Sequence, residues 1–216
     1  MTFDIVDRRI EGYLKGLLGG DHPVADEMEA LAKDREFPIV GRTVGVTLEV
    51  LARSIGARRV LEMGSGYGYS AYWFARAVGD GGEVHMTEGD PQNQRHAMDF
   101  LGRAGLVERV HSHVGNALDI IDDLPGEFDV VFCDIDKGDY PAAWARARDR
   151  IRVGGLYLCD NVLWGGRVAE EDVTDDVRPG WTDAVKEHNA AIAGDDRYRA
   201  TIVPTRDGVM VALRVG

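Results

Sequence analysis

Cysteine, long apolar runs and basic charge are all scarce in this chain of 216 residues. Its two cysteines, Cys133 and Cys159, each end an apolar segment, so we expect two buried free thiols rather than a disulfide. No run of about 18 apolar residues occurs, which excludes a transmembrane span. The first residues, MTFDIVDRRIEGYL, include acids and lack the basic-then-apolar pattern of a signal peptide. We therefore expect a cytoplasmic protein.

Acidic residues outnumber basic ones by 37 to 25, which gives a net charge of −12. The negative electrostatic field of such a chain repels phosphate polymers at long range, which argues against a nucleic-acid partner. The content of 44% hydrophobic and 29% charged residues is ordinary for a globular protein. The length suffices for one large α/β domain with a substantial core.

The chain is expected to form a single domain in two parts, N-terminal helices over residues 1–56 and an α/β core over residues 57–216. The first helix should place its apolar residues near one face. Those residues are Ile5, Val6, Ile10, Tyr13, Leu14, Leu17 and Leu18. Two more helices are expected over residues 23–35 and 42–55.

From Arg58 the pattern changes to alternating strands and helices. Strands are predicted at residues 59–63, 83–88, 109–114, 128–133 and 155–159, and helices at 70–78, 91–104, 116–123 and from the fourth strand to 151. A helix near 181–193 precedes two strand-like runs, 198–203 and 209–215, joined by the turn Thr205-Arg206-Asp207-Gly208. The predicted fold is α/β: a Rossmann-like, seven-stranded and mostly parallel sheet that ends in an antiparallel hairpin, with helices on both faces and extra N-terminal helices.

The segment VLEMGSGYGYS, residues 60–70, joins the first core strand to a helix through a glycine-rich turn. This arrangement indicates a nucleotide-type cofactor site at the carboxyl end of the strand. The glycines alone do not show which cofactor binds, because NAD enzymes have the same glycine pattern. Glu62, directly before the turn, would repel a pyrophosphate but suits an ammonium, which favours S-adenosylmethionine. Glu88, at the tip of the next strand, is placed to bind a ribose.

Oxygen-bearing side chains also follow the fourth and fifth strands, which should be neighbours. Asp134, Asp160 and Asn161 offer hard oxygen ligands suited to Mg²⁺ or Ca²⁺. Zinc is disfavoured, because the six histidines are scattered and no histidine or cysteine cluster accompanies these acids. A helix cap or an Asx turn is the alternative interpretation of such residues. Lys137 follows Asp134 closely enough to share this site.

Four segments resemble the cation-dependent O-methyltransferases, which include the caffeoyl-CoA and catechol O-methyltransferases. They are VLEMGSGYGYS, HMTEGDP, VVFCDIDKGDYP and GGLYLCDNVLWGGRV, and the resemblance runs from about Phe37 to the C-terminus. It implies S-adenosylmethionine as the cofactor, S-adenosylhomocysteine as its product, and a divalent cation, with Mg²⁺ preferred over Ca²⁺ or Mn²⁺. It further implies a catechol-type phenolic acceptor and a homodimer.

The resemblance also implies roles for individual residues. Glu62 would bind the cofactor's ammonium and Glu88 its ribose. The residues expected to border the rest of the cofactor are Val40 (through its backbone), Gly64, Ser65, Gly66, Ser70, Gly115, Asn116, Ala117 and Asp134. Asp134, Asp160 and Asn161 would be the metal ligands, and Lys137 the general base. The chain departs from the family pattern at Asn116, where many bacterial relatives have Asp, and at Ile135, where alanine is more usual.

Other interpretations stay open at the level of the sequence. Some bacterial relatives methylate a hydroxylated uridine in tRNA, for which Arg8, Arg9, Lys15, Arg58 and Arg59 could form a local basic patch. A non-catalytic binding module is a second alternative, and an NAD-dependent oxidoreductase is a third, against which the missing third Rossmann glycine argues.

The segment after Asn161 is expected to border the acceptor. Trp164 could stack on an aromatic acceptor, and Gly165-Gly166 could act as a hinge. The acidic stretch 169–176 is equally well explained as a solvated surface loop.

Overall fold

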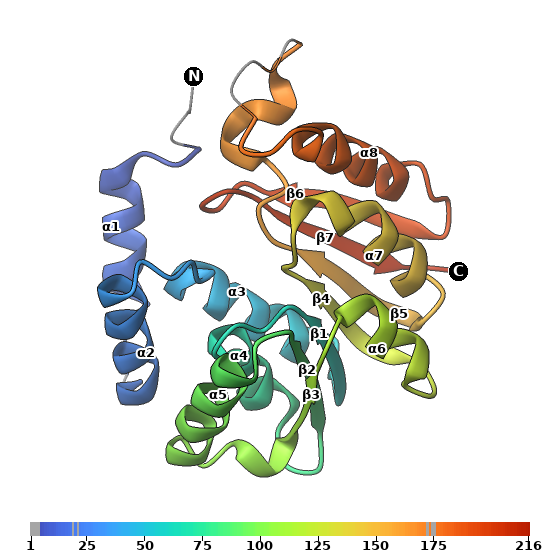
Figure 1. Cartoon of the computed structure of the whole chain (residues 1–216). Coiled ribbons are helices and arrows are strands. Elements are labelled where there is room, and N and C mark those ends of the chain that lie inside the picture. Colours follow the sequence, from blue (N-terminus) through green and yellow to red (C-terminus); the bar gives the residue numbers. More distant parts are fainter. Residues whose placement is uncertain (1–4, 19, 21, 172, 174–175) are drawn as a thin grey trace.

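The computed structural model describes residues 5–18, 20, 22–171, 173 and 176–216 (Figure 1). Its centre is a seven-stranded sheet with strand order β3-β2-β1-β4-β5-β7-β6. The strands are β1 (Arg59–Met63), β2 (Glu83–Glu88), β3 (Val110–Val114), β4 (Phe128–Cys133), β5 (Ile151–Cys159), β6 (Tyr198–Val203) and β7 (Val209–Arg214). Strands β1 to β5 pair in parallel, and β7 runs antiparallel to both β5 and β6. The predicted fold class is therefore confirmed.

Eight α-helices are found in the described part of the chain. They are α1 (Arg8–Leu17), α2 (Pro23–Asp34), α3 (Gly41–Ser54), α4 (Tyr69–Val78), α5 (Pro91–Arg103), α6 (Ala117–Asp123), α7 (Tyr140–Ala147) and α8 (Trp181–Ala193). Short 3₁₀ helices are η1 (Val107–Arg109), η2 (Lys137–Asp139) and η3 (Trp164–Ala169). None of the helices in these segments is long and apolar enough to span a membrane.

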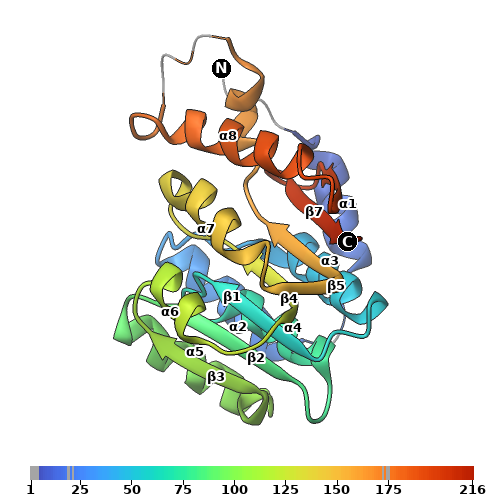
Figure 2. The ribbon, with the colours of Figure 1, turned by 90° about the vertical axis from the view of Figure 1, so that its right-hand side faces the viewer.

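The helices cover both faces of the sheet, with α3, α4 and α5 on one face and α6, α7 and α8 on the other (Figures 1 and 2). Successive side chains of β4 pack on opposite faces of the sheet. Val130 and Phe132 belong to the cluster packed by the first group of helices, whereas Val131 and Cys133 belong to the cluster packed by the second. A strand buried on both sides must be apolar almost throughout, as β4 is. Cys133 and Cys159 are buried and free, as predicted.

Local signals explain why the helices that flank the cofactor turn begin where they do. The Asp90 carboxylate accepts a hydrogen bond from the Gln92 N–H at 2.7 Å, and Pro91 occupies the first turn, so the predicted cap of α5 is present. Gly68 precedes α4 with a φ of 87°, a left-handed conformation that favours glycine. The helix therefore starts at the carboxyl edge of β1.

Three local predictions are corrected by the structure. The helix expected to reach residue 151 ends at Ala147, and β5 begins at Ile151 rather than at residue 155. The pairing of β5 with β4 explains the difference, because Phe128 pairs with Ile151 across an irregular register that accommodates Gly154 at a φ of 79°. The segment 137–139, part of the helix expected after the fourth strand, forms a 3₁₀ turn, and so does the segment 164–169, which was expected as a loop.

The histidines are less scattered than predicted, because two neighbouring strands bring three of them together. His85 Nδ1 lies 3.1 Å from His113 Nε2, and the ring of His111 stacks on that of His85. Among the described residues, no group of three or more His, Cys, Asp or Glu is arranged to hold a metal ion.

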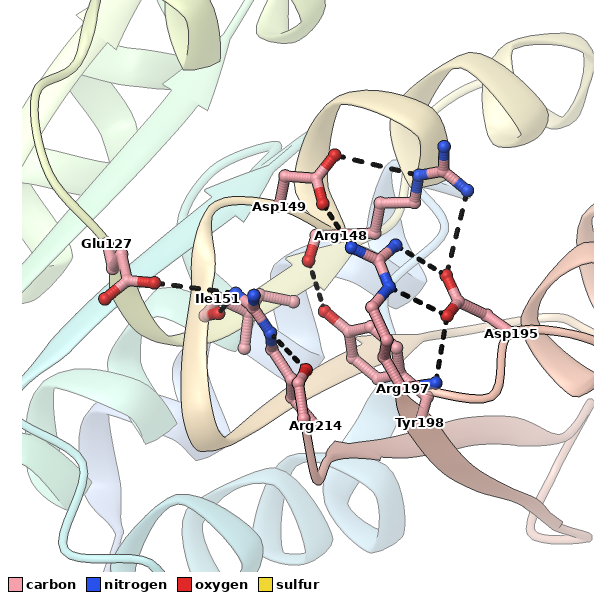
Figure 3. A network of polar contacts seen from close by, with 9 residues as sticks. Glu127, Arg148, Asp149, Ile151, Asp195, Arg197, Tyr198 and Arg214 are labelled. Carbon is pink, nitrogen blue, oxygen red and sulfur yellow. Dashed lines mark hydrogen bonds and ion pairs between the residues drawn. The ribbon is translucent and has the colours of Figure 1, made fainter.

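A network of charged groups ties the C-terminal strands to α7 at the amino end of the sheet (Figure 3). Arg197 donates to Asp195 through Nε at 3.0 Å and Nη2 at 2.7 Å, and to Asp149 through Nη1 at 2.5 Å. The Tyr198 hydroxyl donates to the carbonyl of Arg148 at 2.5 Å. These contacts lie at the opposite end of the sheet from the carboxyl tips of the parallel strands.

Candidate functional site

A cavity of about 1120 Å³ opens at the carboxyl ends of the parallel strands. It is lined by almost all of the predicted site residues, namely Val40, Gly64, Ser65, Gly66, Ser70, Glu88, Gly115, Asn116, Ala117, Asp134, Lys137, Asp160 and Asn161. Glu62 is the exception: it is fully buried, directly behind the turn that forms the wall. Ligands of open parallel sheets bind at this edge, so topology explains why residues from so many segments meet here.

Glu62 is a buried acid that has no hydrogen-bond partner on either carboxyl oxygen among the described residues. Burial raises its pKa to about 7, and the nearby Ser65 and Ser70 hydroxyls offset part of the rise. An unpaired buried carboxyl group is costly and calls for an explanation. A cationic group of a ligand that reaches the wall between Ser65 and Ser70 would supply the missing partner.

The glycine turn is held by Thr87, a fully buried residue that sequence reasoning missed. Its hydroxyl accepts from the Gly64 N–H at 3.1 Å and donates to the Glu62 carbonyl at 3.0 Å. Gly64 has a φ of 83°, and a Cβ there would lie 2.3 Å from the Asp134 carbonyl oxygen. This position therefore requires glycine, because β1 and β4 approach each other too closely for a side chain.

Two predicted cofactor contacts have defined local partners. The Glu88 carboxylate accepts from the Asp90 N–H at 2.8 Å, which fixes its orientation at the tip of β2. The Asn116 side chain accepts from the Leu118 N–H at 2.8 Å and so caps α6. The structure thus gives Asn116 a helix-capping role, whatever its backbone contributes to the cavity wall.

The side chains after β4 and β5 converge on one ammonium group. Lys137 is buried, and its Nζ lies 2.9 Å from Asn161 Oδ1, 3.4 Å from Asp134 Oδ1 and 3.3 Å from the Ile135 carbonyl oxygen. The structure therefore brings Asp134, Lys137 and Asn161 together. Asn161 is held at a left-handed φ of 57°, which turns it back toward Asp134.

Asp160 lies beside this group, with 4% of its surface exposed and no hydrogen-bond partner for Oδ1 among the described residues. Burial and the charge of Asp134 raise its pKa to about 7. The pKa of Asp134 is itself raised by burial, against the opposing effects of Lys137 and Arg206. Two neighbouring acids with raised pKa values favour the uptake of positive charge.

The donor set fits a hard divalent cation better than any other metal. Two carboxylates and an amide carbonyl supply only oxygen, and the remaining positions would be filled by water or by oxygens of a substrate. The Lys137 ammonium shows that Asp134 and Asn161 can both reach one positive centre.

Aromatic side chains form the wall next to Lys137. The rings of Trp164 and Trp181 lie 5.8 Å apart, and both line the cavity. The predicted hinge residues Gly165 and Gly166 both adopt left-handed conformations inside η3. The Gly165 N–H donates to Asp207 Oδ1 at 2.6 Å, which ties η3 to the turn between β6 and β7. Of the acidic stretch 169–176, residues 172, 174 and 175 lie outside the described residues.

Sequence reasoning missed several residues of the cavity wall that come from the N-terminal helices. Glu29 of α2 accepts from Arg42 at 2.8 Å and from the Tyr69 hydroxyl at 2.5 Å. Val40 precedes α3 directly, so the predicted segment does reach the cavity. Polar residues spaced across α2 could have signalled this wall, but their partners lie 13 and 40 residues away in sequence.

The strand order, the glycine turn and the cavity at the carboxyl edge define a Rossmann-like α/β protein with a site for a nucleoside-type cofactor. The O-methyltransferase family model matches residues 21–215 of the chain. A catechol O-methyltransferase of Niastella koreensis is 32% identical, over 94% of this chain and 96% of the relative. A catechol O-methyltransferase of Mycobacterium tuberculosis is 38% identical, over 78% of each chain.

Among solved structures, the O-methyltransferase TomG of Streptomyces achromogenes, crystallised in complex with SAM, is similar with a TM-score of 0.86. It is 30% identical in sequence, and the match covers 96% of each chain. The chain belongs to the O-methyltransferase family, and the resemblance noted in its sequence motifs is confirmed.

Proposed function

We propose that the protein is an S-adenosylmethionine-dependent and divalent-cation-dependent O-methyltransferase that methylates one hydroxyl of a vicinal dihydroxy aromatic molecule. Membership of the family supports the reaction type. The catechol O-methyltransferases among its relatives support the acceptor class, and the SAM bound to TomG supports the cofactor. Mg²⁺ is the preferred metal in this proposal, with Ca²⁺ or Mn²⁺ as alternatives.

One observation carries the proposal: the convergence of Asp134 and Asn161 on a single ammonium, with the unpartnered oxygen of Asp160 beside them. These oxygens share one cavity with the wall that covers Glu62. In this proposal, the cation and the cationic cofactor share one cavity, as methyl transfer from a sulfonium to an oxygen of the acceptor requires.

On the cofactor side, Glu62 would pair with the ammonium of the methionine moiety and Glu88 with the ribose hydroxyls. When bound, S-adenosylmethionine supplies an electrophilic methyl group on a sulfonium, and the divalent cation supplies charge that favours a deprotonated acceptor hydroxyl. The walls around the cavity align the acceptor oxygen with that methyl group. Such alignment contributes roughly 7–11 kcal/mol to lowering a barrier.

On the acceptor side, Lys137 would take the proton as a neutral amine, because a divalent cation bound at Asp134 and Asn161 would favour the loss of a proton from its ammonium. A free phenol has a pKa of about 10, so the hydroxyl must be deprotonated by a neighbouring group at neutral pH. Lys137 Nζ is the buried nitrogen at this place, and it lies next to the two candidate metal ligands. Trp164 and Trp181 would pack against the aromatic ring and exclude water.

The test is transfer of a labelled methyl group from S-adenosylmethionine to catechol. With Mg²⁺ present we expect turnover, and with excess EDTA we expect none until Mg²⁺ is restored. Asp160→Asn should lower kcat/KM by about 100-fold or more, because a misplaced cation no longer aligns the acceptor. Binding of the cofactor by the variant, measured by calorimetry, shows that the fold is retained.

Asp99→Asn is the matched control, because Asp99 is an exposed acid on α5 whose ion-pair partner is Arg103 of the same helix. This variant should keep wild-type turnover and metal dependence. Turnover that persists unchanged in EDTA, or that survives Asp160→Asn, would contradict the proposed metal-dependent reaction.

A further inference from the structure

Arg206 lies in the turn between β6 and β7 and extends its side chain along the wall of the cavity. Its φ is 50°, a left-handed conformation that is unfavourable for a non-glycine residue. Among the described residues, four non-glycine residues have positive φ values: Glu36, Asn161, Trp164 and Arg206. All four line the cavity, so the strained backbone of this chain is concentrated at its site.

The backbone of this turn is anchored on the segment that follows the candidate metal ligands. The Leu163 N–H donates to the Asp207 carbonyl at 2.9 Å, and the Val162 N–H donates to the Gly208 carbonyl at 3.2 Å. The Asp207 carboxylate accepts from the Gly165 N–H. Arg206 is therefore held at a fixed position relative to Asp160 and Asn161.

The guanidinium group packs against the segment that leads into α3. Its Nη1 donates to the Ile39 carbonyl at 2.7 Å. A Cβ on Gly41 would lie 2.6 Å from the same Nη1, so the glycine leaves room for the guanidinium. The hydrogen bond to Ile39 uses one of the five N–H donors of Arg206, and its acceptor is an uncharged carbonyl oxygen.

The charge of Arg206 is not compensated by a contacting acid. Three other cations of the cavity wall have such a partner: Lys15 pairs with Glu11 at 2.8 Å, Arg42 with Asp26 and Glu29, and Lys137 with Asp134. In the described part of the chain, no carboxylate lies within ion-pair distance of Arg206 or of Lys33. Of these two, Arg206 is the one whose turn is bonded to residues 162–165, directly after the candidate metal ligands Asp160 and Asn161.

We infer that Arg206 binds a carboxylate carried by the acceptor, so that the preferred acceptors are vicinal diphenols with an acidic substituent. This inference rests on the proposed function, since it concerns the acceptor of that reaction. An arginine fork with free donors is suited to a carboxylate. A chain with a net charge of −12 repels anions at long range, so an acidic acceptor requires a local cation of this kind.

The cofactor also carries a carboxylate, but the position of Arg206 favours the acceptor. In S-adenosylmethionine the carboxylate and the ammonium are bonded to the same carbon. A residue that binds the carboxylate should therefore lie close to Glu62, the proposed partner of the ammonium. In the strand order β3-β2-β1-β4-β5-β7-β6, the proposed cofactor residues Glu62 and Glu88 belong to β1 and β2, on one side of β4. The turn that carries Arg206 lies on the other side of β4, beyond β5, which Asp160 follows and next to which the acceptor is proposed to bind.

The experiment compares two acceptors, 3,4-dihydroxybenzoate and 3,4-dihydroxybenzamide, which differ in charge but hardly in shape. The measured quantity is the ratio of their kcat/KM values for each variant, so that intrinsic differences in reactivity between the two phenols cancel. Arg206→Gly should lower the benzoate-to-benzamide ratio by about 10- to 100-fold through the KM for benzoate. Glycine accepts the left-handed φ without strain, so the turn should be retained.

Arg206→Lys keeps the charge and should retain part of the preference. Arg199→Gln is the matched control, because Arg199 is an exposed arginine of the same hairpin whose only acceptors among the described residues are the carbonyls of Asp196 and Tyr198. This control should leave the ratio unchanged. The KM for S-adenosylmethionine should be the same in all four proteins, and the kcat/KM for benzamide should be unchanged in Arg199→Gln.

An unchanged ratio in Arg206→Gly would overturn the inference. A rise in the KM for S-adenosylmethionine with both acceptors would also overturn it, since Arg206 would then serve the cofactor's carboxylate. A wild-type protein that methylates neither acceptor in the presence of Mg²⁺ would instead contradict the proposed function. Turnover of both acceptors without preference would leave that function intact and refute the role of Arg206 alone.

Discussion

At the scale of single residues, Glu62 places a carboxyl group where water does not reach. Burial raises its pKa from 4.5 to about 7. Below pH 4.5 the group carries its proton in both the folded and the unfolded chain. Between pH 4.5 and 7 the unfolded chain releases this proton while the folded chain retains it. The folded state therefore loses stability as the pH rises through this window.

Glu62→Gln should remove this pH dependence. Relative to the wild type, the variant without cofactor should gain about 3 kcal/mol in unfolding free energy between pH 4.5 and pH 8, because a shift of one pKa unit corresponds to about 1.4 kcal/mol. Urea unfolding at the two pH values measures the change. The same variant should bind S-adenosylmethionine more weakly, because the partner of its ammonium is neutral.

Glu108→Gln provides the comparison, since Glu108 is an exposed acid in the 3₁₀ helix η1, which precedes β3. Its difference from the wild type should be nearly the same at both pH values. A Glu62→Gln protein whose unfolding free energy follows the wild type in parallel across this range would show that Glu62 ionises as in water.

The residues that the sequence identified and those it missed differ in how far apart their partners lie. Asp134, Asp160 and Asn161 were predictable because each follows an apolar strand, and parallel strands end at one edge. Arg206 was read only as part of a turn, because its partner Ile39 lies 167 residues away. Thr87 was missed because a threonine inside β2 looks like an ordinary strand residue.

At the scale of helices and strands, the two ends of the sheet carry different kinds of polar groups. The carboxyl end holds the cavity, where acids are unpartnered and the backbone is strained. The amino end holds the network around Arg197, in which Asp195 and Asp149 accept its hydrogen bonds (Figure 3). The charged groups that tie the fold together at the amino end are therefore different from the groups that line the cavity at the carboxyl end.

Arg197→Met should therefore destabilise the protein without affecting catalysis. We expect a loss of about 1 kcal/mol, because Arg197 is partly exposed and its ion pairs are screened by solvent. For a chain of this length, that corresponds to a fall in Tm of roughly 2–4 °C. Calorimetry measures the shift, and kcat/KM at 25 °C should equal that of the wild type. Arg199→Met, which removes contacts to two carbonyls only, should shift Tm less.

Element boundaries were predictable where local chemistry sets them. The bounds of β1, β2, β4 and α8 agree with the prediction, because apolar runs and caps mark their ends. The start of β5 was not predictable, because Arg152-Val153-Gly154-Gly155 has no strand pattern of its own. Its conformation is set by pairing with β4, where Arg152 donates to the Asp129 carboxylate at 2.5 Å. Tertiary contacts override local preference in this segment.

At the scale of the whole molecule, the distribution of charge bears on the alternative tRNA substrate. The basic residues considered for a local patch do not gather on one face. Arg58 donates to the carbonyls of Val78 and Asp80, and Arg59 to Glu83, at the amino end of the sheet. Lys15 pairs with Glu11 on α1, next to the cavity at the other end. These basic residues therefore lie at opposite ends of the sheet, and the paired acids neutralise part of their charge.

The protein should accordingly show no affinity for bulk tRNA at physiological salt and should transfer no labelled methyl group to it. A net charge of −12 opposes the approach of a phosphate polymer, and binding that depends on phosphate contacts would fall steeply as salt rises. Filter binding between 50 and 200 mM salt measures the affinity, and scintillation counting of recovered tRNA measures transfer. Catechol in the same preparation serves as the positive control for activity. Retention of tRNA that weakens with salt, together with labelled nucleoside in its digest, would move the acceptor from a small phenol to RNA.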